Sequence, residues 1–236
     1  MKLVLLPGMD GSGRLFDNFL SFYGDDNQII VLPTDIPQDY PSLANYVTTL
    51  LPAEDCIILA ESFSGGIVPH LINGSNQQIK GIIFVASFLS CPNRTLIEIA
   101  KRLPIKIMSK LPFSDLIQRY LFFDNKTSPE QLSLFNNILE SIPSTILRAR
   151  FNTMIGMQAP SQPTTIPAVY IQATRDKLVS ADKWLEISNL FDGIKRVQIM
   201  GPHFVLQSLP EESARRVFEA VFFLTPRQAL KQPKQK

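Results

Sequence analysis

The chain has 236 residues, of which 45% are hydrophobic and 19% are charged, and its formal net charge is +2. This balance is typical of a globular domain with a sizeable core, and it excludes a disordered, collagen-like or disulfide-stapled chain. The small net charge gives no indication of a nucleic-acid partner. Because there are two cysteines and two histidines, we expect no disulfide framework, no bound metal and no cofactor.

The N-terminal residues MKLVLLPGMDG contain a run of four apolar residues, whereas a secretory signal needs about 7 to 15. The chain also lacks a run of the roughly 18 apolar residues that a membrane-spanning helix requires. We therefore expect a cytoplasmic protein without a membrane span.

Short runs rich in Val, Ile and Leu alternate with longer segments of helical periodicity, which is the pattern of strands buried on both faces of a parallel sheet. The expected strands cover residues 2–6, 28–32, 56–60, 81–86, 168–173 and 195–200. Helices are expected over 15–23, after a cap at Ser42, after Ser180 and from Pro210. The pattern predicts an α/β fold with a mostly parallel, doubly wound sheet of about six strands.

One connection is too long for a single crossover helix. About 80 residues separate the fourth and fifth expected strands, although a crossover needs only a dozen or so. The segment keeps helical spacing, and prolines divide it into short helices, one of which begins at Ser128. We expect a helical cap over 88–160, inserted into a core formed by 1–87 and 161–226, and a flexible basic tail over 227–236.

The residues after the third expected strand fit a nucleophilic serine at a strand-to-helix turn. Such a turn is strained, so the residues two positions before and after the serine must be small. Ser62 has Ala60 and Ser64 at these positions, while Ser64 has Ser62 and Gly66. Ser62 is the better candidate because it follows the apolar run directly. The alternative is a turn of small residues that only permits close packing.

Later in the chain, Asp176 lies just past the fifth expected strand and His203 just past the sixth. A carboxylate in this position can hold a histidine in one tautomer. Alternatively, Asp176 is a loop aspartate paired with Arg175 or Lys177. The other histidine, His70, lies on the helix after the serine turn, and we interpret it as a structural or surface residue.

Three glycines, at positions 8, 11 and 13, lie between the first strand and the first helix. A dinucleotide-binding loop also joins a strand, glycines and a helix, and Asp35 lies near the place of its ribose-binding acid. The glycine spacing is not the G-x-G-x-x-G of that loop. The dinucleotide interpretation stays open as the weaker alternative.

With these candidates in this order, the chain resembles the α/β-hydrolase superfamily, and in particular its serine carboxylesterase-like and thioesterase-like members with a helical cap. The resemblance implies a catalytic triad of Ser62, Asp176 and His203. It also implies an oxyanion hole formed by the backbone N–H groups of Met9 and Phe63.

The chain departs from the superfamily pattern in two places. Many members carry His-Gly where this chain has Pro7-Gly8, although a backbone donor survives this change. The chain also begins where the third strand of the superfamily usually falls. The resemblance therefore implies six strands in the order second, first, third, fourth, fifth, sixth, with the switch point between the first and third strands.

The resemblance implies a hydrolase that cleaves a carboxylic ester or thioester through an acyl-enzyme on Ser62. The partner would be a small to medium substrate with an apolar acyl part, held by Phe88, Met154 and Phe204 unless these residues only fill the core. The alternatives are an acyltransferase, a C–C hydrolase or a lyase with the same triad, or a catalytically silent binding protein.

Overall fold

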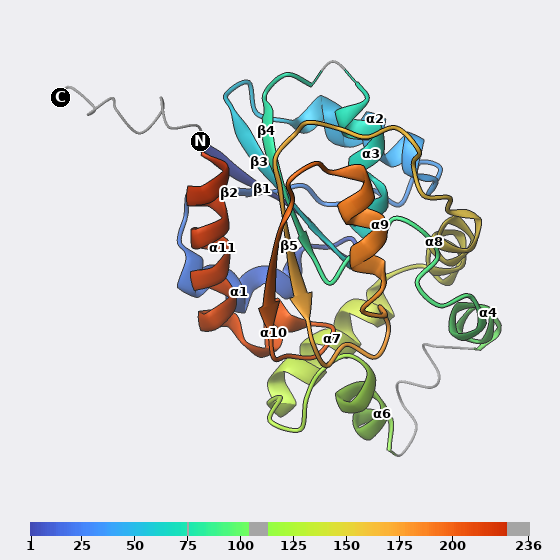
Figure 1. Cartoon of the computed structure of the whole chain (residues 1–236). Helices are drawn as coiled ribbons and strands as arrows, with labels where there is room; N and C mark the ends of the chain where they lie inside the picture. The colour runs from blue at the N-terminus through green and yellow to red at the C-terminus, as the bar shows by residue number, and fades with distance from the viewer. Residues whose placement is uncertain (75, 104–112, 226–236) are drawn as a thin grey trace.

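The computed structural model describes residues 1–74, 76–103 and 113–225 (Figure 1). The expected tail over 227–236 lies outside the described residues. Six parallel strands form one sheet in the order β2-β1-β3-β4-β5-β6. The strands are β1 (Lys2–Leu6), β2 (Asn27–Ile29), β3 (Cys56–Glu61), β4 (Ile79–Val85), β5 (Ala168–Ala173) and β6 (Lys195–Ile199). The predicted α/β fold and strand order are confirmed.

Helices cover both faces of the sheet (Figure 1). Side chains of α1 and α11 pack with Leu3 and Leu5 of β1, whereas side chains of α2, α3 and α9 pack with Val4 on the opposite face. These elements are η1 (Arg14–Phe16), α1 (Asp17–Tyr23), α2 (Tyr40–Leu50), η2 (Ser62–Gly66), α3 (Val68–Ile72), α9 (Lys183–Leu190), α10 (Val205–Ser208) and α11 (Pro210–Leu224). Within the described ranges, no helix combines the length and the apolar character needed to cross a membrane.

Two local predictions were wrong. The second strand ends at Ile29 because Leu32 N–H donates to Gly11 O (2.8 Å), in the loop after β1, and the chain leaves the sheet there. The cap of α2 is Asp39 and not Ser42. The Asp39 carboxylate accepts a hydrogen bond from the Ser42 N–H (2.9 Å), which places Pro41 in the first turn, where its missing N–H is not needed.

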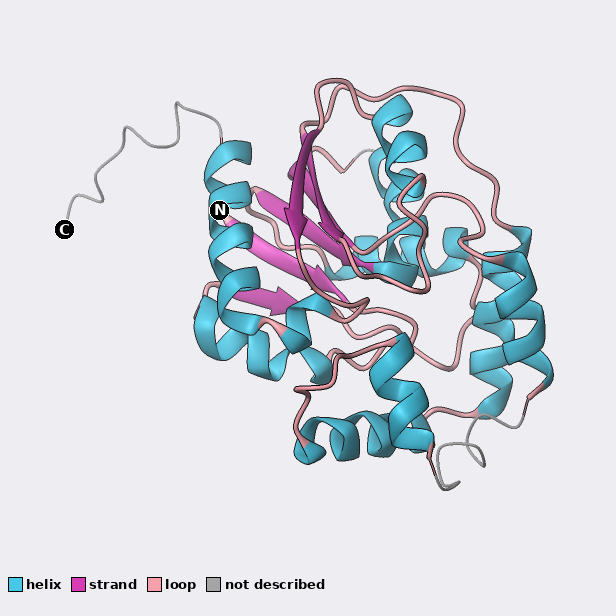
Figure 2. Cartoon of the chain, turned by 60° about the horizontal axis from the view of Figure 1, so that its bottom comes forward, coloured by secondary structure: helices cyan, strands magenta, loops and turns pink. Residues whose placement is uncertain are grey.

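The segment between β4 and β5 contains four described helices, α4 (Arg94–Arg102), α6 (Ser114–Leu121), α7 (Pro129–Ser141) and α8 (Ser144–Gly156). Ser128 caps α7 as predicted, since its Oγ accepts from the Gln131 N–H. Figure 2 shows these helices beyond the end of the sheet toward which the strand arrows point. Ile97, Phe151 and Met154 join the apolar cluster on one sheet face, while α7 packs in a separate cluster with Phe204.

The strand order creates a crevice between β1 and β3. These two strands pair directly, with Leu6 opposite Ala60. The helix after β1 packs on one face of the sheet, and the helix after β3 packs on the other. The two connections therefore diverge, and a ligand can enter between them, as in other doubly wound sheets.

We predict that the amides of residues 113–157 exchange with solvent before those of β3 and β4. The two central strands are fully hydrogen-bonded and buried, whereas Pro129 and Pro143 divide the helical segment into short helices, which can open locally at lower free energy. Hydrogen exchange followed by mass spectrometry measures this order. Exchange of the segment only together with β3 and β4 would show that it is an integral layer of the core.

Candidate active site

Ser62 occupies a strained turn directly after β3. It opens η2 with a φ of 48°, in the left-handed region that residues with a Cβ rarely adopt. The Ser87 Oγ holds the turn by donating to the Ser62 carbonyl (2.7 Å). A Cβ at position 65 would lie 1.9 Å from that Oγ, so Gly65 is required for the close approach. The turn presents the Ser62 side chain at the carboxyl end of the sheet.

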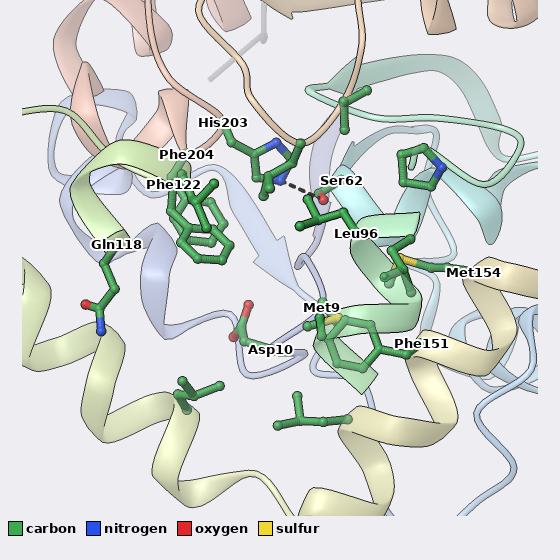
Figure 3. Close-up of a pocket in the computed structure, with 18 of the residues that line it drawn as sticks. Met9, Asp10, Ser62, Leu96, Gln118, Phe122, Phe151, Met154, His203 and Phe204 are labelled. Atoms are coloured by element: carbon green, nitrogen blue, oxygen red, sulfur yellow. Dashed lines mark hydrogen bonds between the residues drawn. The ribbon is translucent and has the colours of Figure 1, made fainter. Parts of the chain in front are cut away.

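The three residues of the expected triad lie in one chain of hydrogen bonds. Ser62 Oγ is 2.9 Å from His203 Nε2 (Figure 3), and His203 Nδ1 is 2.8 Å from Asp176 Oδ2. The other oxygen of Asp176 accepts from the backbone N–H groups of Leu178 (2.8 Å) and Val179 (3.0 Å). The carboxylate is thus fixed by its own loop, and it can orient the imidazole toward the serine.

The alternative partners of Asp176 point elsewhere. Arg175 forms an ion pair with Asp124 at 3.8 Å, and the Lys177 ammonium lies over the ring of Tyr120. The loop aspartate interpretation therefore has no support in the described contacts. Asp176 faces His203, and both side chains are only 4% exposed.

His203 is placed to accept a proton from Ser62. Burial lowers the pKa of its imidazole, but the Asp176 carboxylate and, more weakly, the charge of Glu61 outweigh burial and raise the pKa above its ordinary value. A raised pKa makes the histidine a stronger base. It also means that acid inactivates the site at a higher pH than an unperturbed histidine would allow.

Ser64 and His70 do not join this arrangement. Ser64 is completely buried, and its hydroxyl donates to the Pro7 carbonyl, which ties η2 to the loop after β1. His70 is exposed on α3. This short helix follows the 3-10 turn η2, which contains Ser62.

The loop after β1 lies against the serine turn. A Cβ at Gly8 would lie 3.8 Å from the Ser62 Cβ, so the peptide between Gly8 and Met9 passes beside the serine. The Met9 side chain lines the cavity next to Ser62. Phe63 is the second residue of η2, and the first N–H groups of a helix have no partner within it. This geometry suits both expected oxyanion donors.

Glu61, the carboxylate nearest to Ser62 in the sequence, is a further buried group of the site to which the sequence pattern assigns no role. It is 2% exposed and accepts a hydrogen bond from Gln207 Nε2 (2.9 Å), and its Oε2 lies 3.6 Å from the position of a Cβ at Gly8. Burial raises the pKa of its carboxyl to about 7. The only local signal was a charged residue at the end of an otherwise apolar strand.

A cavity of about 270 Å³ opens between the serine turn and the helical segment (Figure 3). Phe88, Met154 and Phe204 line it, together with Ser62 and His203. Helices α4, α6, α7 and α8 supply further apolar side chains, including Leu96, Ile97, Ala100, Ile117, Leu121, Phe135, Ile138, Leu139, Leu147 and Phe151. The lining is therefore predominantly apolar, with the serine hydroxyl at its wall.

The described residues give little support to a metal or dinucleotide site. In that part of the chain, no three His, Cys, Asp or Glu side chains gather in a way that could hold a metal ion. Strand β1 lies between β2 and β3, which is not the order of a dinucleotide-binding sheet. Asp35 is exposed in the loop beyond β2.

Comparisons with known proteins agree with this fold. A family model described as serine aminopeptidase, S33, matches residues 33–198. No curated protein sequence matches the chain. A thermophilic esterase has a similar structure, with a TM-score of 0.78 and 14% identity over 94% of this chain and 90% of its own.

Two further structures share the fold. A bromoperoxidase from Bacillus anthracis gives a TM-score of 0.76 and 13% identity, covering 92% of this chain and 90% of its own. An esterase from Exiguobacterium antarcticum gives 0.74 and 14%, covering 95% and 91%. At these identities the likeness concerns the fold, which carries different activities in different proteins.

We predict that Asp176→Asn leaves the protein folded but reduces turnover by up to about 10⁴-fold, because the imidazole loses its orienting partner. Residual activity should have its acid limb at lower pH, since removal of the carboxylate lowers the pKa of His203. The pH dependence of kcat/KM measures both effects. Near-normal turnover in the folded variant would contradict the role of Asp176.

Proposed function

Because the chain belongs to the serine aminopeptidase S33 family of α/β-hydrolases, we propose that it is a serine hydrolase that cleaves a carboxylic ester or thioester with an apolar acyl part. One observation carries the proposal. The hydrogen-bonded chain from Asp176 through His203 to Ser62 ends on a strained turn, and that turn faces an apolar cavity. The esterase-like structural neighbours are consistent with this chemistry.

In the proposed mechanism, His203 Nε2 removes the proton from Ser62 Oγ as the oxygen attacks the acyl carbonyl. The carbonyl oxygen becomes an oxyanion, which the N–H groups of Met9 and Phe63 stabilise. The carbon–oxygen or carbon–sulfur bond then breaks, and the imidazolium gives its proton to the leaving alcohol or thiol. Water, deprotonated by His203, attacks the acyl-enzyme, releases the carboxylic acid and regenerates Ser62.

The apolar cavity supports an acyl group of several carbons. Burial of each methylene group contributes about 0.8 kcal/mol, and the side chains of α4, α6, α7 and α8 offer a surface for it. We further propose that the segment 88–160 acts as a cap that covers this acyl site and excludes water. A cytoplasmic location is part of the proposal, since both cysteines are unpaired.

An acyltransferase, a C–C hydrolase or a lyase would use the same triad. An acyltransferase differs from the proposed hydrolase in the group that accepts the acyl carbon, a C–C hydrolase in the bond that breaks, and a lyase in eliminating a group without an acyl acceptor. The described residues contain no observation that favours one of them. A catalytically silent binding protein is the alternative of a different class. It would retain the cavity but not react with a serine-directed reagent.

The nucleophile is tested with a fluorophosphonate probe and p-nitrophenyl esters. We expect the wild type to be labelled, and Ser62→Ala to lose labelling and at least about three orders of magnitude in turnover. Ser64→Ala is the matched control, two residues away in the same turn, and it should retain labelling. Labelling that depends on Ser64, or no labelling of the wild type, would overturn the assignment.

The acyl pocket is tested with p-nitrophenyl esters of increasing chain length. Leu96 lines the cavity, so Leu96→Trp should fill part of it and lower the octanoate-to-acetate ratio of kcat/KM by about tenfold or more. Leu185→Trp is the control, because Leu185 is exposed on α9 and lies outside the cavity. An unchanged ratio in Leu96→Trp would place the acyl group elsewhere.

A further inference from the structure

Arg150 is the largest completely buried side chain of the described protein, with 0% exposure, and it comes from α8 of the helical segment. Its guanidinium donates to three neutral oxygens. Nη1 donates to the Met9 carbonyl (2.8 Å), Nε to Gln38 Oε1 (2.8 Å), and Nη2 to the Pro33 carbonyl at 3.4 Å. This buried cation takes part in none of the steps of the proposed mechanism.

The guanidinium also packs against the loop that carries Met9. A Cβ at position 11 would lie 2.5 Å from Arg150 Nη1, so only Gly11 permits this contact. The Gly11 N–H in turn donates to the Gly8 carbonyl (3.0 Å) and closes the loop around Met9. Arg150 therefore holds the loop just after the Met9 Cα, directly at the Met9 carbonyl and indirectly at Gly11, whose N–H binds the carbonyl of the Gly8–Met9 peptide.

The same side chain also lies near the ring of Phe63, whose backbone N–H is the second expected oxyanion donor. The Arg150 guanidinium carbon lies 5.9 Å from the centroid of the Phe63 ring, which is completely buried. Glu61, next to Ser62, also lies against this loop, since its Oε2 would be 3.6 Å from a Cβ at Gly8. The Gly8 carbonyl, which belongs to the same peptide as the Met9 N–H, accepts from the Gly11 N–H, and Arg150 packs on Gly11.

We propose that Arg150 is a positioning residue that fixes the Met9 peptide for oxyanion stabilisation and so makes catalysis depend on the docked position of α8. The catalytic role of Arg150 rests on the proposed function. Its role in fixing the position of the loop rests on the contacts described above. A fork of planar donors is needed to reach two or three oxygens in different directions, which a lysine ammonium on a single stem does not reproduce.

Burial lowers the pKa of Arg150 to about 10, while the charge of Asp10 opposes this effect, so the side chain remains a cation at neutral pH. A buried cation is costly unless its donors are satisfied. Each donor contact found here ends on the oxyanion loop or on the 33–38 segment that packs beside it. The guanidinium therefore holds these two loops in place. It does not form an ion pair at the protein surface.

The test compares Arg150→Met with Thr153→Val. Thr153 lies on the same helix and donates to the backbone carbonyl of Gln38 (2.9 Å), so its substitution removes one neighbouring hydrogen bond of α8 and leaves the three Arg150 donor contacts that dock the helix in place. For Arg150→Met we expect kcat to fall about 10- to 100-fold with KM changed less than about threefold, since a displaced donor loses transition-state stabilisation. Affinity for an alkylboronic acid, which forms a tetrahedral adduct on a serine, should fall by the same factor as kcat/KM.

Hydrogen exchange of the Gly11 and Ser12 amides gives a readout that does not need activity. Both amides are hydrogen-bonded within the loop. Arg150→Met should accelerate their exchange by about tenfold or more while β3 stays protected, and Thr153→Val should change neither the loop nor kcat. If Arg150→Met does not fold, Arg150→Lys keeps the charge and should show the same changes to a smaller extent.

Unchanged loop exchange in a folded Arg150 variant would overturn the inference, as would a change in KM alone or equal effects of Thr153→Val. Failure of the proposed function looks different. In that case the wild type itself is neither labelled by fluorophosphonate nor active on esters, and the loop exchange still decides whether Arg150 positions the Met9 peptide.

Discussion

The left-handed backbone of Ser62 is the constraint on which the site depends. A serine with a φ of 48° is unfavourable in isolation, so the surroundings must hold it. They do so with a fully buried β3 before the turn, the Ser87 hydroxyl on the Ser62 carbonyl, and Gly65 where no Cβ would fit. The buried central strand and these contacts together fix the direction in which the Ser62 hydroxyl group points.

Burial and fixed hydrogen-bond partners set the protonation of the ionisable groups in the site. His203 lies under the influence of two carboxylates, Asp176 in direct contact and Glu61 at longer range. Asp176 is held by backbone donors of its own loop, whereas Glu61 is held by Gln207 and lies against Gly8. Each carboxylate therefore contacts a loop or helix of the site as well as influencing the imidazole.

The helical segment lines the cavity and also contacts the site. Besides the contacts of Arg150, two hydrogen bonds join it to residues near His203. Phe204, next to His203, donates its N–H to the Phe122 carbonyl (2.9 Å), and Gln131 of α7 donates to the Gln207 carbonyl (2.8 Å). The helical segment that lines the cavity therefore contacts Phe63 after the serine, Phe204 after the histidine and the carbonyl of Met9. Under the proposed function, substrate selection and catalysis share these supports.

The sequence by itself determined the strands, their order through the resemblance, and the placing of Ser62, Asp176 and His203 after the third, fifth and sixth strands. These features are local, because an apolar run and the residue that ends it are read within a few positions. Only the tertiary structure decided that Glu61 and Arg150 are buried at the site. Each partner of Arg150 lies more than a hundred residues away, and a charged residue in a helix ordinarily indicates a solvent-facing position. A contact between distant segments leaves no periodicity in either of them, so the burial of a charge becomes visible only when the chain is folded.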